Sequence, residues 1–363
     1  MLVHSRPVTV AECDGRHGGS SQVAIFTMRF DFRNPPIAGT SMAERYQAAL
    51  EMAEWADRLG FYSVAVSEHH TSDDGYLPSP LTMSAALAAR TRNVRIMVAA
   101  LIAPFYDPLR LAEDTAVLDH LSAGRFDLVL AGGYVPAEFE MLGVPSKERA
   151  RRVTEVIQTL RQAWTGEPFE YRGRTVRVTP AAYSPKGPGI TMGGSSEAAA
   201  RRAARLEIGF TPTDGGCWEH YRDETIKLGR PDPGPHFGRS GTFTHVARDV
   251  DAGWEQIAPY AMHETNAYGA WIAAGGPGAA TTVFRPCESA DELRATGQYR
   301  VLTPEQFTEE LRAQGPFALG ILTPMMGGIP PAIAWESLKL IENEVIPNLT
   351  EPAEAKVHPA AGR

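Results

Sequence analysis

The chain has few cysteines, and their spacing excludes the common cysteine-based architectures. Its 363 residues contain three, Cys13, Cys217 and Cys287, with no CxxC pair among them. An odd number at such wide spacing predicts neither a disulfide framework nor a structural zinc site. Reduced thiols are typical of the cytoplasm, where we expect the protein to reside.

Long apolar runs are also missing. No stretch of the sequence approaches the length needed to cross a membrane. Residues 1–21 contain charges and glycines instead of the apolar core of a signal peptide. We expect residues 1–21 to form a flexible extension and residues 351–363 a flexible tail, and we expect no membrane partner.

The sequence has no long run of positive charge. Its formal net charge is −8, so it has no general electrostatic attraction for nucleic acid. The largest basic cluster, Arg149, Arg151 and Arg152, is flanked by Glu148 and Glu155. This pattern is typical of ion pairs on an exposed helix face. We predict no nucleic-acid partner.

Three nucleotide and nucleophile motifs are absent from the sequence. It has no strand-GxGxxG-helix, no GxxxxGK[ST] and no GxSxG. Their absence argues against a dinucleotide domain, a P-loop and a serine nucleophile elbow.

What the sequence does contain is a repeated alternation of β-rich runs and helical patterns. Eight strand-helix units predict a parallel sheet closed into a (β/α)8 TIM barrel, one domain over residues 22–350. The alternative, an open doubly wound sheet, is disfavoured because the first turn, 33–36, has no glycine fingerprint. The predicted strands are 23–26, 62–66, 94–102, 125–131, 189–192, 207–211, 242–247 and 317–322. The predicted helices are 41–60, 79–90, 108–121, 146–164, 195–206, 218–228, 250–271 and 332–346.

Two segments fall outside this alternation. Residues 169–178 alternate in polarity and predict a small hairpin. Residues 273–302 are too long for a plain loop and include a glycine-rich stretch at 275–278. We interpret them as an insertion before the last strand, suited to serve as a lid.

The active site of such a barrel lies at the carboxyl ends of the strands. The second predicted strand leads into Glu68-His69-His70, which suits acid-base chemistry. Taken alone, such a triplet is better explained by hydrogen bonds to neighbouring loops. A metal site is disfavoured because the other strand ends offer glycine, serine and alanine as neighbours, so we predict no metal.

Small residues follow the third and fourth strands. Ala99 and Ala100 would let a flat ring approach the backbone, although barrel packing alone also explains them. The fourth strand leads into Gly132-Gly133-Tyr134 and then Glu138. Paired glycines there indicate either close approach of a ligand or a turn with positive φ.

The fifth strand leads into the strongest anion site of the sequence. Met192, Gly193, Gly194, Ser195 and Ser196 stand where a helix begins. Backbone N–H groups, hydroxyls and the positive helix end favour a phosphate there, and an N-cap with a tight turn is the alternative. Together, these strand ends suit a flat cofactor that carries a phosphate.

These motifs resemble the bacterial-luciferase (luciferase-like monooxygenase) family over residues 23–349. The most specific parts are residues 60–70, 108–119, 121–126, 193–196 and 327–330. The resemblance implies a TIM barrel in which reduced FMN and O2 form a C4a-peroxyflavin that oxidises a small organic substrate. It also implies a separate flavin reductase and a homodimer.

The resemblance further implies roles for individual residues. His69 matches the histidine near the flavin C4a position, and Glu138 matches an acidic residue near the ring. Ala99 and Ala100 match a pair beneath the ring that is often joined by a cis peptide bond. The site residues that would hold the cofactor are Glu68, Ala99, Ala100, Tyr134, Arg149, Met192, Gly193, Gly194, Ser195 and Ser196, with the last five at the ribityl phosphate and Arg149 as the phosphate-binding arginine.

Two positions depart from the family pattern. Luciferase has a reactive cysteine and a phosphate-binding arginine after the fourth strand, where this chain has Ala131 and Gly132. Either Arg149 replaces the lost charge-assisted contact or the cofactor is held more weakly. Light emission is not implied.

The sequence therefore favours a two-component flavin monooxygenase. The alternatives are a deazaflavin-dependent dehydrogenase or reductase of the same superfamily and a flavin-binding protein without turnover. The sequence does not identify the substrate. Tyr76, Phe105, Tyr106 and Trp218 are candidates for lining an apolar pocket, or simply for packing.

Overall fold

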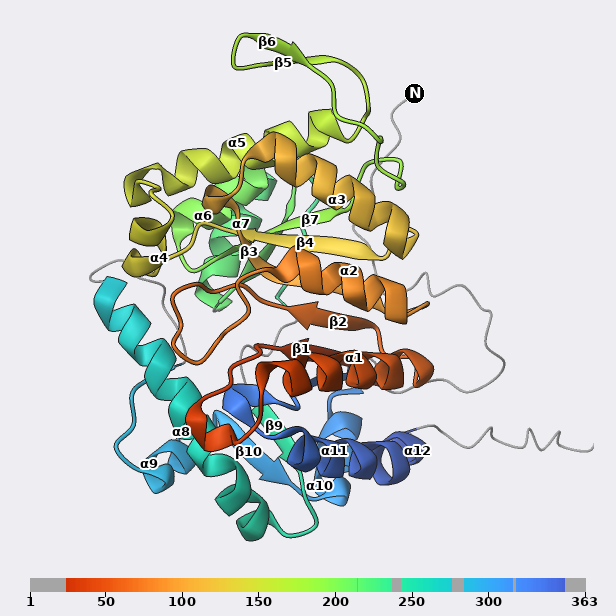
Figure 1. Ribbon diagram of the computed structural model, residues 1–363, viewed down its shortest axis with the longest axis vertical. Coiled ribbons are helices and arrows are strands. Elements are labelled where there is room, and N and C mark those ends of the chain that lie inside the picture. The colour runs from red at the N-terminus through yellow and green to blue at the C-terminus, as the bar shows by residue number, and fades with distance from the viewer. Residues whose placement is uncertain (1–23, 214, 237–242, 276–283, 316–317, 350–363) are drawn as a thin grey trace, which may run out of the picture.

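The computed structural model describes residues 24–213, 215–236, 243–275, 284–315 and 318–349. The predicted extension, the predicted tail and part of the predicted insertion lie outside these residues. Figure 1 shows an α/β arrangement in which helices cover a curled sheet. Within the described residues, no helix is both long and apolar enough to cross a membrane.

The centre of the fold is a sheet of seven strands in the order β11-β1-β2-β3-β4-β7-β8. Every neighbouring pair in this sheet is parallel, as the alternation of strands and helices predicts. The strands are β1 (Ala24–Phe30), β2 (Ser63–Val66), β3 (Arg95–Ile102), β4 (Phe126–Ala131), β7 (Gly189–Gly194), β8 (Gly209–Pro212) and β11 (Ala318–Leu322).

The predicted helices are all present, with ends shifted by a few residues. They are α1 (Met42–Arg58), α2 (Pro80–Arg90), α3 (Pro108–Ser122), α5 (Arg149–Ala163), α6 (Glu197–Arg205), α7 (Gly215–Lys227), α8 (Val250–Gly275) and α11 (Pro331–Leu340). The predicted capping box starts α1, since the amide of Glu44 donates to Ser41 Oγ and the amide of Ser41 donates back to the Glu44 carboxylate.

The closed eight-stranded barrel is seen only in part. The predicted seventh strand is β9 (Phe243–Val246), and it pairs with β10 (Tyr299–Leu302) in a separate two-stranded sheet. Among the described residues, no hydrogen-bonded pairing joins β9 to β8 or to β11. The hydrogen-bonded neighbour of β9 is instead β10, a strand that the sequence pattern did not reveal.

The segment predicted as an insertion has regular structure. Helix α8 extends to Gly275, and α9 (Ala290–Ala295) and β10 follow. Helix α10 (Pro304–Ala313) then leads to β11, and a short helix α4 (Pro136–Met141) follows β4; neither was predicted. The predicted hairpin is confirmed as β5 (Phe169–Tyr171) and β6 (Arg174–Val176), which projects from the body of the molecule beyond α5 (Figure 1).

A buried arginine ties the start of the fold to its end. Arg45 of α1 is fully buried, and its guanidinium donates to the carbonyls of Met325, Gly328 and Ile329 in the turn after β11. These bonds hold α1 against the last βα connection and fix one wall of the strand-end region.

Candidate functional site

His69 lies at the carboxyl end of β2 and is paired with a carboxylate from the short helix α4. Its Nδ1 lies 2.8 Å from Glu138 Oε1, and the same oxygen accepts the backbone N–H of His70 at 2.9 Å. Glu138 is fully buried, and its other oxygen, Oε2, has no hydrogen-bond partner among the described residues. The structure therefore brings together the two residues predicted to be catalytic.

The pairing sets the protonation pattern of His69. Because Glu138 Oε1 already accepts the amide of His70, it acts as an acceptor for His69 as well, and Nδ1 carries the proton. Burial lowers the pKa of His69 below its ordinary value, although the hydrogen bond and charge of Glu138 oppose this shift. At neutral pH the imidazole is thus uncharged, with Nε2 as its basic nitrogen.

Glu68 and His70 form a second pair next to the first. The Glu68 carboxylate lies 2.9 Å from His70 Nε2 and accepts the Tyr106 hydroxyl at 2.8 Å and the backbone N–H of Ile102 at 2.6 Å. Although burial opposes it, the Glu68 interaction raises the pKa of His70. Both oxygens of Glu68 have protein partners, so this side chain braces the end of β2 against the end of β3.

Small residues form a floor beside this pair. The peptide bond between Ala99 and Ala100 is cis, and the pairing of β3 with β4 shifts register around Ala100. A Cβ placed on Gly193 would lie 3.1 Å from a Val129 methyl and 3.9 Å from the Ala100 methyl. Ala100 and Gly193 therefore lie close together, and neither carries a side chain larger than a methyl group.

The turn after β7 starts helix α6. Ser196 is the N-cap and its hydroxyl accepts the amide of Ala199. Gly194 has no room for a side chain, because an added Cβ would lie 2.7 Å from the Ala199 methyl. Met192 is 1% exposed and alternates with Gly193, so its side chain points to the other face of the sheet. Ser195 precedes the cap and is partly exposed.

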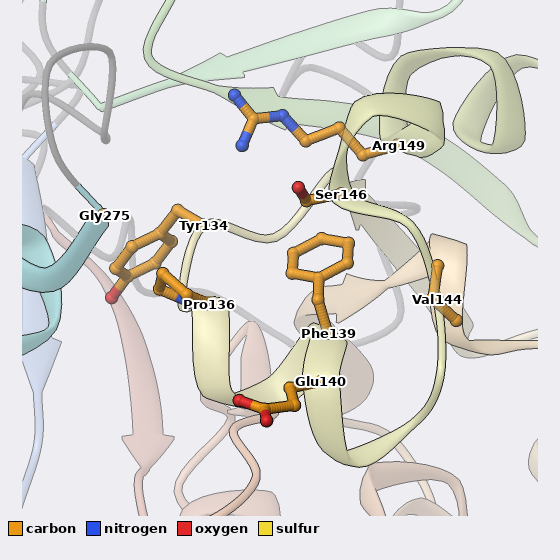
Figure 2. A pocket seen from close by; sticks show the side chains of 8 residues that line it. All are labelled: Tyr134, Pro136, Phe139, Glu140, Val144, Ser146, Arg149 and Gly275. Carbon is orange, nitrogen blue, oxygen red and sulfur yellow. The ribbon is translucent and has the colours of Figure 1, made fainter.

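A cavity of about 320 Å³ lies beside these strand ends. Figure 2 shows Phe139 and Tyr134 facing it, with the Arg149 side chain extended along one edge and the Ser146 hydroxyl beside it. The Tyr134 ring also lies edge-on to His69, with ring centroids 5.7 Å apart. The lining residues are Tyr134, Pro136, Phe139, Glu140, Val144, Ser146, Arg149 and Gly275.

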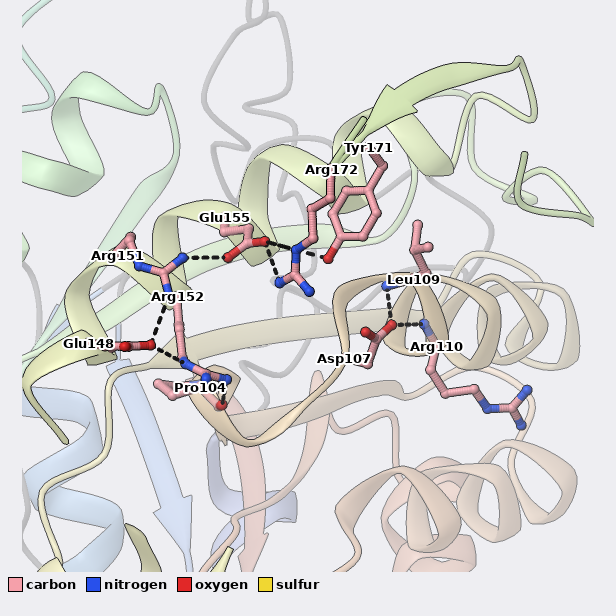
Figure 3. Close-up of polar contacts among 10 residues, drawn as sticks. All are labelled: Pro104, Asp107, Leu109, Arg110, Glu148, Arg151, Arg152, Glu155, Tyr171 and Arg172. Atoms are coloured by element: carbon pink, nitrogen blue, oxygen red, sulfur yellow. Dashed lines mark hydrogen bonds and ion pairs between the residues drawn. The ribbon is translucent and has the colours of Figure 1, made fainter. Parts of the chain in front are cut away.

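Arg149 differs from the other arginines of its cluster. Arg151 pairs with Glu148 and Glu155, and Arg152 pairs with Glu148, as the spacing predicted (Figure 3). Arg149 makes no ion pair with a described residue, and its stem lies over Gly132, where an added Cβ would be 3.9 Å from Cγ and Cδ. Arg149 therefore lies next to Gly132, the position at which the luciferase pattern has an arginine.

An aromatic cluster near His69 combines Tyr76, a predicted pocket candidate, with Tyr268 and Trp271, which the sequence did not suggest. The His69 ring lies 4.8 Å from the Tyr76 ring and 4.4 Å from the Trp271 ring, and 5.9 Å from the Tyr268 ring, between centroids. Tyr268 and Trp271 lie on α8 at a spacing of three residues, so the signal was the aromatic face of this helix. The structure thus brings α8 over the end of β2.

The other pocket candidates have different surroundings. Phe105 packs against His70 and Phe139, with centroids 5.6 and 4.9 Å apart. Trp218 packs against Tyr221 and His236 on and beside α7, away from the cluster around His69. The described residues contain no group of three metal-binding side chains placed to hold an ion.

Comparison with solved structures supports the fold. The chain aligns with monooxygenase RslO1 from Streptomyces bottropensis with a TM-score of 0.71 and 24% identity, covering 89% of this chain and 99% of that one. It aligns with the oxygenating constituent of 3,6-diketocamphane monooxygenase from Pseudomonas putida, a type II Baeyer-Villiger monooxygenase in complex with FMN. There the TM-score is 0.68 at 21% identity, and the alignment covers 89% of this chain and 98% of that one.

Curated relatives match parts of the chain. Over 251 residues it is 28% identical to 4-hydroxyprotoasukamycin monooxygenase of Streptomyces nodosus subsp. asukaensis, covering 63% of this chain and 66% of that protein. Over 202 residues it is 29% identical to the FMNH(2)-dependent dimethylsulfone monooxygenase of Pseudomonas fluorescens, covering 51% and 54%. The chain thus spans less than two thirds of the length of these relatives. The profile described as luciferase-like monooxygenase matches residues 25–313, which is most of the chain, and the chain therefore belongs to this family.

Proposed function

We propose that the protein is a flavin-dependent monooxygenase that uses reduced FMN and O2 to oxidise a small organic substrate. The observation that carries this proposal is the buried His69–Glu138 pair, 2.8 Å apart, at the carboxyl end of β2. The family and its relatives with FMN in their names support the choice of cofactor.

The residues present fit a reduced flavin. The floor of Ala99, Ala100 and Gly193 offers a flat surface for the ring system. The cavity beside it contains an arginine, Arg149, that no carboxylate neutralises among the described residues, which suits the phosphate. Ser195 and the first turn of α6 are the second candidates for phosphate contacts.

Bound FMNH2 supplies the two electrons with which O2 is split, so that one oxygen atom enters the substrate and the other leaves as water. The protein residues hold and move protons around this chemistry. Glu138 fixes the Nδ1 proton of His69, which leaves Nε2 free to accept or return a proton at the reacting centre. Tyr76, Tyr268 and Trp271 surround this imidazole and exclude water from it.

The proposal includes a partner and an assembly. A separate flavin reductase would supply FMNH2, since the sequence has no dinucleotide motif. We also propose that β9 completes an eight-stranded barrel and that two copies form a homodimer. Val117 and Leu121 of α3 are 46% and 54% exposed, which is compatible with a partner on this helix.

An anaerobic titration tests the cofactor. The protein is titrated with FMNH2 and with a reduced deazaflavin, and the flavin absorbance and fluorescence report binding. Oxygen is then admitted in a stopped-flow instrument. We expect tight binding of FMNH2 and a transient absorbance that matches neither reduced nor oxidised flavin. Binding of only the deazaflavin contradicts the proposal and favours the dehydrogenase alternative.

Variants test the role of His69. We expect His69→Ala to bind FMNH2 but to lose the transient or its productive decay, with a rate loss of about 100-fold or more. His120→Ala is the matched control, since His120 contacts the Ala181 carbonyl on the exposed surface. Normal turnover by the His69→Ala variant contradicts the proton-transfer role assigned to His69. FMN binding without reaction in the unaltered protein indicates a flavin-binding protein without turnover.

A further inference from the structure

Arg33 is a fully buried arginine whose hydrogen-bonding capacity is only partly used. It follows β1, and its Nη1 lies 2.5 Å from Asp74 Oδ2. Its Nε and Nη2 are buried and have no hydrogen-bond partner among the described residues. Leaving a buried donor without a hydrogen-bond partner destabilises the folded chain. Two such donors on one side chain therefore require an explanation.

The two unused donors share one edge of the guanidinium. In the planar group, Nε–H and one N–H of Nη2 point the same way, which is the arrangement that grips both oxygens of a carboxylate. The two faces of the group are occupied, because the rings of Tyr76, Tyr268 and Trp271 lie 4.8, 4.7 and 4.5 Å from Cζ. This edge carries the unpartnered donors that a new partner would use.

Charged groups of both signs surround Arg33. Arg29, Arg33 and Arg45 interact with one group of carboxyls, Asp31, Asp74 and Glu264. Burial raises the pKa of Glu264 to about 7, so part of this carboxyl is uncharged at neutral pH. His263 also shares Asp74, with Nε2 2.7 Å from Oδ2. The two unpartnered donors of Arg33 belong to a positively charged group, so they favour an anionic partner.

The position of this edge connects it with the proposed chemistry. Tyr76, Tyr268 and Trp271, which surround the Arg33 cation, are the same rings that contact His69. Trp271 is the only one of these three rings that keeps partial exposure. A substrate held by Arg33 would therefore lie beside the proposed proton-transfer residue.

We propose that Arg33 anchors a carboxylate of the substrate through its Nε–Nη2 edge, which makes the substrate a small organic acid. This inference rests on the proposed function for its location, but it concerns binding and is tested without flavin. Asp74 holds the opposite edge and orients the guanidinium for this contact.

Binding of matched acid and amide probes tests the proposal. Benzoate, phenylacetate and hexanoate are each compared with their primary amides by calorimetric titration of the full protein at pH 7.5. We expect at least one acid to bind about tenfold or more tightly than its amide. If no acid binds more tightly than its amide, the proposal is overturned, whatever the protein does with flavin.

Substitutions locate the site of acid binding. We expect Arg33→Lys to lower the affinity for the preferred acid about tenfold, because an ammonium cannot present two parallel donors. Arg110→Lys, on the exposed face of α3, is the control and should bind as the unaltered protein does. Unchanged affinity in Arg33→Lys refutes the assignment.

A second measurement is independent of variant folding. A crystal of the unaltered protein soaked with the preferred acid should show its carboxylate oxygens within hydrogen-bond distance of Arg33 Nε and Nη2. An acid bound elsewhere refutes the proposal. A failure of the proposed function is recognised separately, by the absence of any reaction of bound FMNH2 with oxygen.

Discussion

At the scale of single residues, the behaviour of His69 depends on one buried carboxylate. Glu138 accepts from both His69 Nδ1 and the His70 amide, so it fixes ring orientation and tautomer together. Without this acceptor, the imidazole would lose both its fixed orientation and the charge that opposes the effect of burial on its pKa. The two residues therefore act as a unit although they come from different elements.

We predict that Glu138→Gln lowers the pKa of His69 further. The amide oxygen still accepts the Nδ1 proton, but the negative charge that opposes the effect of burial is gone. Because this pKa already lies below the ordinary value near 6.5, the native state resists protonation and loses stability as the pH falls below that value. Histidine NMR titration and urea unfolding between pH 5 and 8 measure both effects, and an unchanged or raised pKa contradicts the prediction.

A second pH effect is expected from Glu264. Burial raises its pKa to about 7 from 4.5, and Tyr299 donates to its Oε2 at 2.7 Å. Between these two pH values the native state holds a proton that the unfolded state has lost, so stability falls as the pH rises from 4.5 to 7. We predict that Glu264→Gln removes this loss and gains stability relative to the unaltered protein at pH 8, but not near pH 4.

Denaturant unfolding at both pH values measures this difference. Glu113→Gln, on the exposed surface of α3, is the control and should leave the free energy of unfolding unchanged at both pH values. An equal effect of Glu264→Gln at both pH values shows that the carboxyl titrates normally.

At the scale of elements, the connection from β4 to α4 places Glu138 under His69. Gly133 makes this turn with a φ of +72°, and an added Cβ would lie 2.8 Å from a methyl of Ile102. Both the backbone conformation and the close approach require glycine. The predicted alternatives of a ligand contact and a positive-φ turn are thus resolved in favour of the turn at this position.

We predict that Gly133→Ala destabilises the protein by about 2 kcal/mol or more, since strain at positive φ and the contact with Ile102 add. Gly143→Ala is a matched control, because Gly143 has a φ of +64° but nothing within 4 Å of an added Cβ. The control should cost only about 1 kcal/mol. Equal losses in the two variants, measured by urea unfolding, would show that the contact with Ile102 is easily relieved.

At the scale of the whole molecule, the fold depends on contacts between its two ends. Arg45 of α1 donates to three carbonyls that follow β11, about 280 residues later in the chain, at distances from 2.9 to 3.3 Å. These bonds complement the pairing of β1 with β11. They stabilise the side of the site that is formed by the ends of β1 and β11, next to Asp31 and Arg33.

We predict that Arg45→Met lowers the free energy of unfolding by about 3 kcal/mol or more, because it leaves buried carbonyls without their charged donor. Arg110→Met is the control, and its exposed pairs on α3 should contribute less than about 1 kcal/mol. A loss below about 1 kcal/mol in Arg45→Met would show that water replaces the guanidinium.

The sequence alone determined the local structure and the position of much of the candidate site along the chain. Apolar periodicity, the capping box at Ser41 and proline at helix starts depend on neighbouring residues, so they are readable without the fold. The same holds for the location of Glu68-His69-His70 and of the small residues at strand ends. The sequence also raised the hypothesis that Arg149 replaces the arginine missing at Gly132. The Arg149 stem lies beside Gly132, and its contact with a phosphate stays a prediction.

Only the tertiary structure decided which residues meet. Pairing of β9 with β10 depends on hydrogen bonds between segments about 55 residues apart, and no local pattern encodes it. The aromatic face of α8 was visible as a helix pattern, but its place beside His69 and Arg33 was not. The two unused donors of Arg33 were likewise not visible in the sequence. Whether a polar group is buried and hydrogen-bonded depends on the packing of the whole chain and not on the neighbouring residues in the sequence.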